Sequence, residues 1–285
     1  MNLYVTTEEI KTFMGIATGV TTYDTLIAMF NKMATSVVNS ILGAKDLSLH
    51  KVTDEVQDAQ NQYLNLYEAP IVAIEKIMDD DVEYTQDEAY DILLNRVRLE
   101  NWLTYGPRKT KITYAAGYHA YGYTKITITD IANLAAAATI TLGAVATDGF
   151  TITRGTDWNL ATSAGLEAIN IAAAINAKAG TNAFAISNIV YVIEATNPQV
   201  ITRTITASDL VRLAMSTTTL TGLNFPEDIR LAIMVYVSNL MNIRKNPKIR
   251  SYSIGGKSVS FASDAEFNQF NDLLKPFKKF GVKAI

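Results

Sequence analysis

Two helices are predicted near the N-terminus. Thr6 and Glu9 have the Ser/Thr-x-x-Glu spacing of a capping box, which predicts a short helix that ends near Gly15. A longer helix is expected over residues 22–42, with Gly43 as its stop, because apolar side chains recur there every three or four residues. These apolar residues are Leu26, Ile27, Phe30, Met33, Ala34, Val37, Val38 and Ile41. Such an apolar face needs a partner surface within the fold.

Between residues 47 and 117 the hydrophobic period changes from that of a helix to about two, which is typical of strands. Turn signals separate the apolar runs at Pro70, at residues 79–81 and at Gly106-Pro107. The strand-like runs cover residues 63–67, 71–74, 90–94, 96–99 and 111–114. This pattern predicts a small antiparallel meander.

Residues 122–225 differ from the rest of the chain in composition. Of these 104 residues, 20 are Ala, 19 are Thr and 11 are charged, which marks a domain boundary. A hairpin is predicted from residues 138–142 and 150–153, followed by a helix over 166–175. Two further strands are expected at 189–193 and 200–205. The order is therefore ββαββ.

The C-terminal segment again has a helical period. Pro226 suits the first turn of a helix, where its missing N–H would be unpaired anyway. The apolar stripe of this helix contains Ile229, Ala232, Ile233, Tyr236, Val237 and Leu240. We expect it to pack against the helix over 22–42. Residues 252–261 have an extended pattern, and residues 265–280 a helical one up to a break at Pro276.

Charge is unevenly distributed. Residues 1–121 hold 10 Lys and Arg against 17 Asp and Glu, whereas residues 226–285 hold 10 against 5. The short, mixed basic tail favours an acidic partner surface over nucleic acid. No apolar run approaches the ~20 residues that cross a bilayer, so no membrane contact is expected. The chain has no cysteine, which excludes disulfides and thiolate metal sites.

Catalytic patterns are weak. His50 and His119 have no second ligand or carboxylate at a useful spacing. Residues 79–81 read Asp-Asp-Asp, which fits a charged turn better than an incomplete calcium loop. Residues 255–258 lack the earlier glycine of a phosphate-binding loop. Tyrosines between 114 and 123 could stack on bases or sugars, or pack at a domain junction. We therefore expect no enzyme activity, no cofactor and no metal site.

Three segments outside residues 122–225 occur in the order of one motif set. The first, residues 112–118, reads Ile-Thr-Tyr-Ala-Ala-Gly-Tyr; the second opens a helix with Phe225-Pro226-Glu227-Asp228; the third, residues 253–261, reads Ser-Ile-Gly-Gly-Lys-Ser-Val-Ser-Phe. Together they resemble the head–tail adaptor (connector) proteins of tailed bacteriophages, the head-completion adaptor family. There, a TY-x-x-GY strand leads within a few residues to a P-x-D-I-x-x-A helix and then to an S-x-S-I-G-x-x-S-V-S-[YF] segment.

In this chain about one hundred residues separate the strand from the helix. The helix Ala168–Ala177 within them resembles the Ala-rich helix of virion decoration domains. The expected fold is therefore α+β: a helical adaptor core with a small antiparallel β region, plus an inserted small α/β (ββαββ-like) domain. The expected boundaries are 1–121 and 226–285 for the discontinuous core, and 122–225 for the insertion.

The resemblance implies a structural protein of the phage neck, assembled in the bacterial host cytoplasm. It implies a ring, usually of twelve protomers, between the portal protein and a tail-side neck or tail completion protein. Genomic DNA would pass through the lumen without sequence-specific binding. The alternative is a virion surface protein whose inserted domain binds a carbohydrate or host receptor.

The resemblance also implies a docking segment for the portal near the C-terminus. Ile254, Val259 and Phe261 would supply apolar anchors. The Gly255-Gly256 pair would let the chain turn into a groove. The alternative for this segment is a local hairpin folded back on its own core.

Overall fold

The computed structural model describes residues 3–43, 47–59, 63–84, 90–93, 96–99, 106–118, 123–143, 149–178, 181–194, 204–216, 225–245, 251–254, 257–260 and 264–277. Contacts divide the chain into two units. Residues 1–46 and 225–285 form the first, which we call the helical unit. Residues 47–224 form the second, which we call the β unit.

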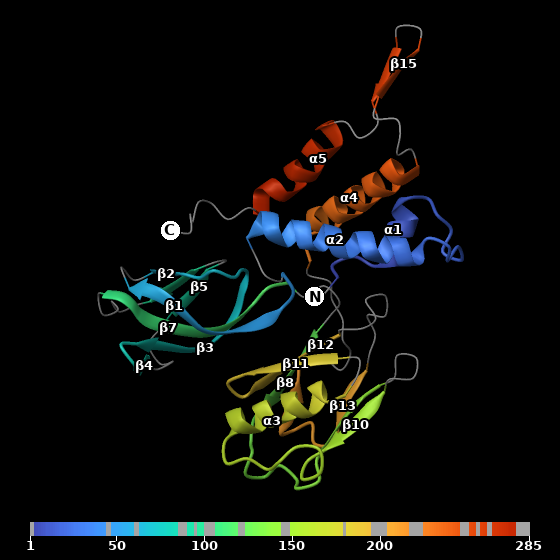
Figure 1. Ribbon diagram of the computed structural model, residues 1–285. Helices are drawn as coiled ribbons and strands as arrows, with labels where there is room; N and C mark the ends of the chain where they lie inside the picture. The colour runs from blue at the N-terminus through green and yellow to red at the C-terminus, as the bar shows by residue number, and fades with distance from the viewer. Residues whose placement is uncertain are drawn as a thin grey trace. The chain divides into compact units, whose positions relative to one another are not determined.

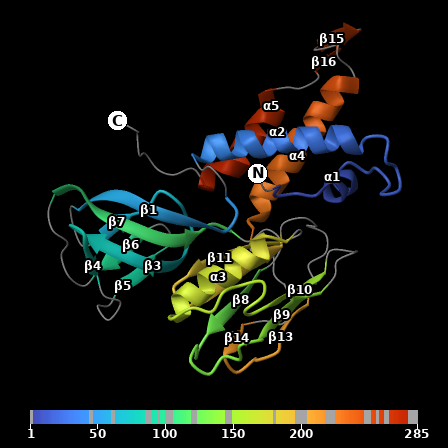
Figure 2. The same ribbon diagram turned by 60° about the horizontal axis from the view of Figure 1, so that its bottom comes forward.

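The helical unit combines both ends of the chain. Its helices are α1 (Thr7–Phe13), α2 (Asp24–Leu42), α4 (Glu227–Lys245) and α5 (Asp264–Leu274), with a 3-10 turn at Lys275–Phe277. Helix α4 contacts α1, α2 and α5, as Figures 1 and 2 show. Its buried residues include Ile229, Ala232, Ile233 and Val237. The predicted packing of this helix against the helix over 22–42 is confirmed.

The predicted N-terminal capping box is present. Thr6 Oγ1 accepts a hydrogen bond from Glu9 N at 3.0 Å, and Thr6 N donates to Glu9 Oε2 at 2.7 Å. The side chain of Lys11, in the last turn of α1, is fully buried. Lys11 Nζ lies 2.6 Å from Asp24 Oδ1 and 2.9 Å from Glu8 Oε1. Hydrogen bonds with Asp24 and Glu8 raise the pKa of Lys11 above its ordinary value. The start of α2 is therefore tied to α1 by a buried charge.

In the β unit, residues 47–118 form two antiparallel sheets. One has the order β1-β7-β3-β4, from β1 (His50–Ala59), β7 (Gly106–Ala116), β3 (Ile71–Asp79) and β4 (Val82–Tyr84). The other has the order β2-β6-β5, from β2 (Tyr63–Asn65), β6 (Arg96–Leu99) and β5 (Tyr90–Leu93). They share one core, which includes Leu64, Ile77, Val97, Leu99 and Ile112. We call this part the β-sandwich.

Gly117, in the TY-x-x-GY motif, has a physical reason to be glycine. Its φ is +108°, and a Cβ atom there would overlap the carbonyl oxygen of Ser48. The close approach allows Leu49 N to donate to Tyr118 O and Tyr118 N to donate to Leu47 O, each at 2.7 Å. Only glycine fits this backbone conformation without strain.

Residues 123–216 form what we call the inserted lobe. One sheet has the order β11-β12-β8-β14, from β11 (Thr181–Ile186), β12 (Ile189–Glu194), β8 (Tyr123–Ile128) and β14 (Leu213–Met215). The other has the order β10-β9-β13, from β10 (Phe150–Thr153), β9 (Thr139–Leu142) and β13 (Ile205–Ala207). Helix α3 (Ala164–Asn176) packs on β11, β12 and β8. The lobe has its own apolar core, which includes Ile126, Ile140, Ile152, Ile171 and Ile175.

Within the β unit, a second apolar cluster joins the lobe to the β-sandwich. Leu49 and Ala115 of the sandwich pack with Ile186, Tyr191 and Ile193 of the lobe. Lys51 Nζ donates to the carbonyl oxygen of Ala185 at 3.0 Å. The sheet of the lobe therefore has α3 on one face and the β-sandwich on the other.

The expected fold class is wrong. More of the described residues lie in strands than in helices, so a helical adaptor core with a small β region does not describe this chain. The cause is β1, the ten-residue strand His50–Ala59, which the sequence pattern missed. Its residues include four charged side chains and lack clear alternation, because a β-bulge interrupts the pairing with β7 between Val52 and Glu55. The strand order is also not that of a meander. The predicted domain boundaries stay a prediction.

Candidate interaction surface

Helix α2 has two different faces. The face that packs inside the helical unit includes Ile27, Ala34, Val38 and Leu42, which are all buried. Three buried polar residues, Asn31, Thr35 and Asn39, alternate with them. Asn31 Nδ2 donates to Val5 O at 2.6 Å, and Asn39 Oδ1 accepts from Tyr4 Oη at 2.9 Å. The polar residues on this face therefore bind the segment that precedes α1.

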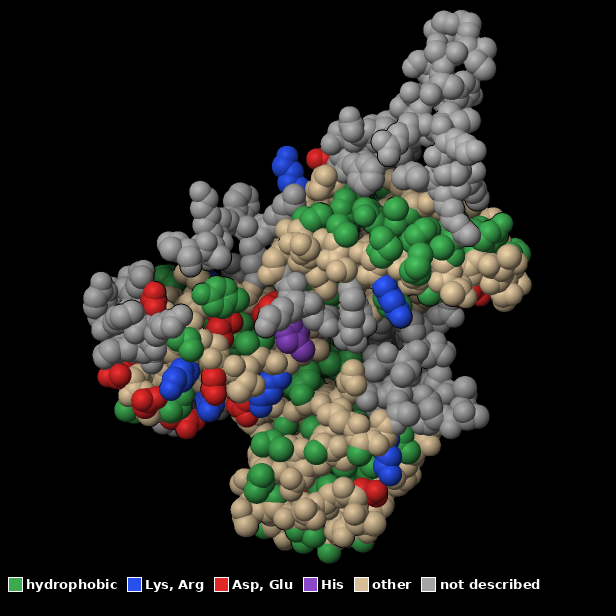
Figure 3. Space-filling model, in the orientation of Figure 1, with side chains coloured by type: hydrophobic (Ala, Val, Ile, Leu, Met, Phe, Trp, Pro, Cys, Tyr) green, Lys and Arg blue, Asp and Glu red, His purple; other side chains and the backbone are tan. Residues whose placement is uncertain are grey.

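The other face of α2 is apolar and partly exposed. Met29 and Met33 are 49% and 46% exposed. Leu26, Phe30 and Val37 are half-buried and continue the stripe at helical spacing. We call these five residues the α2 surface. Figure 3 shows hydrophobic side chains gathered over α2.

The α2 surface is nearly uncharged. Lys32 and Asp24 are the charged residues of α2, and Asp24 binds the buried Lys11. Further exposed apolar residues lie on α1 and the loop that follows it: Phe13, Val20 and Tyr23 are 43%, 38% and 37% exposed. An apolar stripe of this length on a helix is typical of a surface that another protein covers. Methionine suits such a contact because its side chain adapts to the partner's shape.

A membrane is a poor occupant for this stripe. Helices that lie on a membrane carry a strongly charged polar face rich in Lys and Arg, which α2 lacks. Among the residues that the structure describes, none of the helices is long and apolar enough to span a bilayer. The weakly charged polar face of α2 favours a protein partner over a membrane surface.

The predicted portal-docking segment is only partly described. Strands β15 (Ser251–Ile254) and β16 (Lys257–Ser260) pair as an antiparallel hairpin. Ile254 lies opposite Lys257, and Val259 lies opposite Tyr252. Gly255, Gly256 and Phe261 lie outside the described residues. The backbone of this segment is therefore a hairpin, and its binding to the portal stays a prediction.

Other residues singled out in the sequence have structural roles. Asp80 and Asp81 have positive φ angles of 50° and 65° and form the tight turn between β3 and β4. His50 Nδ1 lies 2.6 Å from the carbonyl oxygen of Ser48, whereas His119 lies outside the described residues. The described part of the chain contains no cluster of three potential metal ligands.

The tyrosines near the entry to the inserted lobe are packed. Tyr114 is buried and donates a hydrogen bond to Glu55 Oε2, and burial raises its pKa far above the ordinary value. Tyr123 stacks on Tyr191, with ring centroids 6.3 Å apart. Burial raises the pKa of Tyr191 to about 12. Tyr118 is half-buried, and Tyr121 lies outside the described residues. Packing at the junction thus explains the described members of this group.

The inserted lobe contains a buried ion pair that the sequence pattern did not reveal. Arg154 Nε donates to Glu167 Oε1 at 2.7 Å, and Trp158 Nε1 donates to the same oxygen at 2.8 Å. Ala161 N donates to Glu167 Oε2 at 2.9 Å. Glu167 is fully buried, so this cluster holds the lobe together and offers no free group for chemistry.

The α2 surface was also missed as a surface, although a signal for it exists. Ten apolar residues between positions 26 and 41 are more than one buried stripe requires. Assigning eight of them to one core face, and leaving out Met29, hid the second stripe. Its members could have been separated by placing Asn31 and Thr35 on the helix as well, since these lie between Ile27 and Val38 on the buried face.

Neither a protein-family model nor a curated protein matches the chain. Among solved structures, it is similar to a chain from the neck of an empty GTA particle computed with C6 symmetry, at 15% identity and a TM-score of 0.30. The match covers 41% of this chain and 67% of that chain.

Proposed function

We propose that this chain is a structural protein of the neck of a bacteriophage-like particle. Copies associate into a ring, joining the portal to the tail and leaving a lumen through which genomic DNA passes. The role requires no catalytic group, cofactor or metal. The observation that carries the proposal is the α2 surface: an apolar, almost uncharged helix face whose methionines are about half exposed. The three sequence segments that resemble head–tail adaptors support the choice of the neck.

Contacts between copies through the α2 surface would use the ordinary chemistry of permanent interfaces. Such interfaces have apolar cores depleted of charge, as this surface is. In a ring, one face of each copy meets a different face of the next, so the α2 surface need not pair with itself. The portal and a tail-side neck protein would then bind the two ends of the ring.

The alternative, recognition of a carbohydrate or host receptor by the inserted lobe, has less support. Stacked aromatic rings are the usual platform for sugars, and in this lobe Phe184 and Tyr191 stack at 5.1 Å. Tyr191 is 1% exposed, because this face packs against the β-sandwich. A sugar could not reach that ring.

The test places charges on the α2 surface. The double variant Met29→Asp, Met33→Asp should fold as a single chain, because both side chains are about half exposed. It should weaken self-association at least about tenfold, since each buried charge would lack a partner. Asn242→Asp, at an exposed position of α4, is the matched control. Light scattering over a range of concentrations gives the association, and circular dichroism checks the helices.

Electron microscopy of particles carrying a tagged chain tests the location. We expect the tag at the vertex where the tail joins. Absence of the chain from purified particles, or a parent chain that stays monomeric alone and with the portal, would contradict the proposal.

A further inference from the structure

A buried lysine joins three parts of the helical unit. Lys11 Nζ lies 2.9 Å from Glu8 Oε1 of α1 and 2.6 Å from Asp24 Oδ1, at the start of α2. It also donates a hydrogen bond of 3.1 Å to the carbonyl oxygen of Thr18, in the connection between the two helices. An ammonium group has three hydrogens, and each has an oxygen within reach here. We call these four residues the Lys11 cluster.

The connection between α1 and α2, residues 14–23, has little else to fix it. Residues 17–23 are exposed, so burial of apolar surface contributes little to its order. Its described backbone hydrogen bonds are local, such as Val20 N to Ala17 O at 3.0 Å and Ile16 N to Lys11 O at 2.8 Å. Exposed segments with few buried contacts open at a low cost in free energy.

The adjoining helix ends do not fix the connection by themselves. Helix α1 has seven residues, which is too short for a helix that is stable alone in water. Tyr23, at the N-cap of α2, makes no hydrogen bond that caps the helix through its side chain. The Lys11 cluster is therefore the described contact that ties residues 14–23 to both helices.

The cluster places two carboxylates around one ammonium group. Glu8 Oε2 and Asp24 Oδ1 are buried, although the two side chains as a whole are 32% and 37% exposed. Without the ammonium group, two negative charges would share this site, and their repulsion would favour an arrangement in which water reaches both. Because both side chains already reach the surface, opening of residues 14–23 would hydrate them without unfolding α2 or α4.

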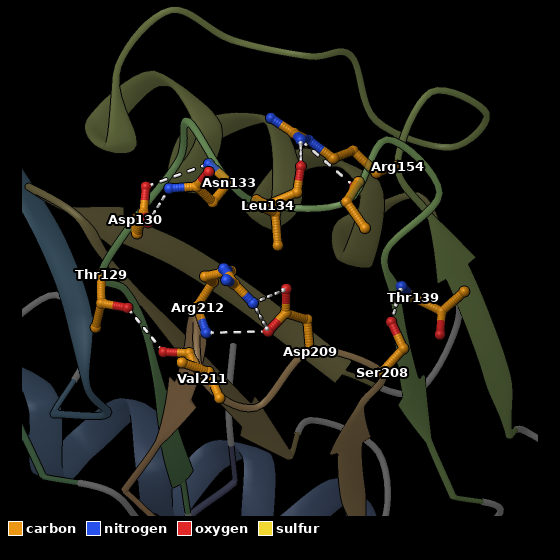
Figure 4. A network of polar contacts seen from close by, with 11 residues as sticks. Thr129, Asp130, Asn133, Leu134, Thr139, Arg154, Ser208, Asp209, Val211 and Arg212 are labelled. Carbon is orange, nitrogen blue, oxygen red and sulfur yellow. Dashed lines mark hydrogen bonds and ion pairs between the residues drawn. The ribbon is translucent and has the colours of Figure 1, made fainter.

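A second buried cation provides a contrast within the same chain. Arg154 of the inserted lobe also reaches a loop, since its Nη1 donates to the carbonyl oxygens of Leu134 and Ala135 (Figure 4). Its carboxylate partner, Glu167, is fully buried. Removal of Arg154 would leave a buried charge that becomes hydrated when the lobe unfolds. The two cations therefore differ in whether their carboxylate partners can reach water in the folded chain.

We propose that Lys11 is a conformational latch, which selects the closed form of residues 14–23. Loss of its charge opens this segment while α2 and α4 stay folded. Lys11 thus contributes conformational specificity more than overall stability, a role documented for some other buried polar groups. The inference uses contacts within the helical unit alone, so it stands or falls separately from the neck role.

Hydrogen exchange tests the latch. In Lys11→Met, the amides of residues 14–23, among them Ile16 and Val20, should exchange at least about tenfold faster than in the parent chain. The amides of α4 should keep the parent rate, and the urea midpoint of the helical unit should stay near that of the parent. Lys32→Met, at an exposed position of α2, is the control and should change neither measurement.

Arg154→Met provides the opposite expectation. It should clearly lower the urea midpoint of the inserted lobe, followed by the fluorescence of the buried Trp158. If Arg154→Met were as mild as Lys11→Met, the exposure of the carboxylate partners would not decide the outcome, and the inference would fail.

A rescue variant separates the charge of Lys11 from the packing of its side chain. Glu8→Gln, Lys11→Met, Asp24→Asn removes all three charges, so the closed form no longer brings like charges together. Exchange of residues 14–23 should then return to near the parent rate. Four results would each overturn the inference: unchanged exchange in folded Lys11→Met, equal acceleration in residues 14–23 and α4, failure of Lys11→Met to fold, or no rescue in the triple variant.

Discussion

Helices α2 and α3 differ in whether their buried polar groups are hydrogen-bonded. Helix α3 buries its single charge, Glu167, and each carboxylate oxygen of that residue accepts at least two hydrogen bonds within the lobe. Helix α2 buries Asn31 and Thr35, and no described group donates to Asn31 Oδ1 or bonds Thr35 Oγ1. The buried carboxylate of α3 therefore has all its hydrogen-bond partners within the lobe, whereas two buried polar atoms of α2 have no described partner.

The exposed faces of the two helices differ in extent. Helix α3 exposes Leu166 and Ile169, which lie one turn apart. The α2 surface runs over three turns, from residue 26 to residue 37. Helix α3, with its buried charge fully hydrogen-bonded and only two large apolar side chains exposed, fits a purely structural role within the lobe. An unsatisfied buried group costs free energy in the single chain, and a long exposed apolar stripe is typical of a surface that a partner covers.

The largest effect should come from the buried pair in the lobe. Glu167→Gln removes the charge that compensates Arg154 and should lower the free energy of unfolding by about 3–5 kcal/mol. Urea denaturation followed by the fluorescence of Trp158 measures the change. Lys178→Met is the control, because Lys178 is 39% exposed and lies 3.4 Å from Asp157, a geometry worth about 0–1 kcal/mol. Equal losses of stability in both variants would mean that the buried ion pair contributes no more than the exposed one.

Substitutions on the two faces of α2 should differ in their effect on stability. Ile27→Ala should cost about 2–5 kcal/mol, since this side chain is fully buried. Met29→Ala, two residues away on the α2 surface, should change the stability of the single chain by no more than about 0.5 kcal/mol. Circular dichroism during denaturation, at concentrations where the chain is monomeric, gives both values. A loss above about 2 kcal/mol for Met29→Ala would mean that this face is part of the core.

The smallest expected effect is a gain. Thr35→Val keeps the shape of the side chain and removes a buried hydroxyl for which the described residues provide no partner. It should raise the stability by about 1 kcal/mol, because an unpaired buried polar group costs free energy. Thermal unfolding should show this as a higher Tm. A clear loss of stability would instead indicate that the hydroxyl binds a buried water molecule.

The sequence revealed the local parts of the fold. The capping box of Thr6 and Glu9, the glycine that ends α2 and the hairpin of β9 and β10 depend on residues close together in the chain, and all three are present. Strands β1 and β8 were missed because their partners lie far away in sequence: β1 pairs with β7, and β8 with β12 and β14. Periodicity cannot supply such pairings.

The α2 surface shows a second limit. A pattern of apolar residues indicates that a helix is amphipathic, but it does not indicate which of two apolar stripes enters the core. That choice was made by Tyr4 and Val5, which bind Asn39 and Asn31 and so draw the polar residues of α2 inside. Contacts between segments 26 and 35 residues apart decide it, and the turn of residues 209–212 depends likewise on a long-range hydrogen bond from Thr129 to Val211.

The division of the helical unit between both ends of the chain has a consequence for its synthesis. Helices α1 and α2 leave the ribosome first, but α4, which covers their core, follows only after residues 47–224 have been made. At roughly 5–20 residues per second, that interval lasts on the order of ten to forty seconds. Throughout it, the side of α2 that contacts α4 in the finished chain lacks that partner. We therefore expect the newly made N-terminus to be prone to wrong association until α4 has been made.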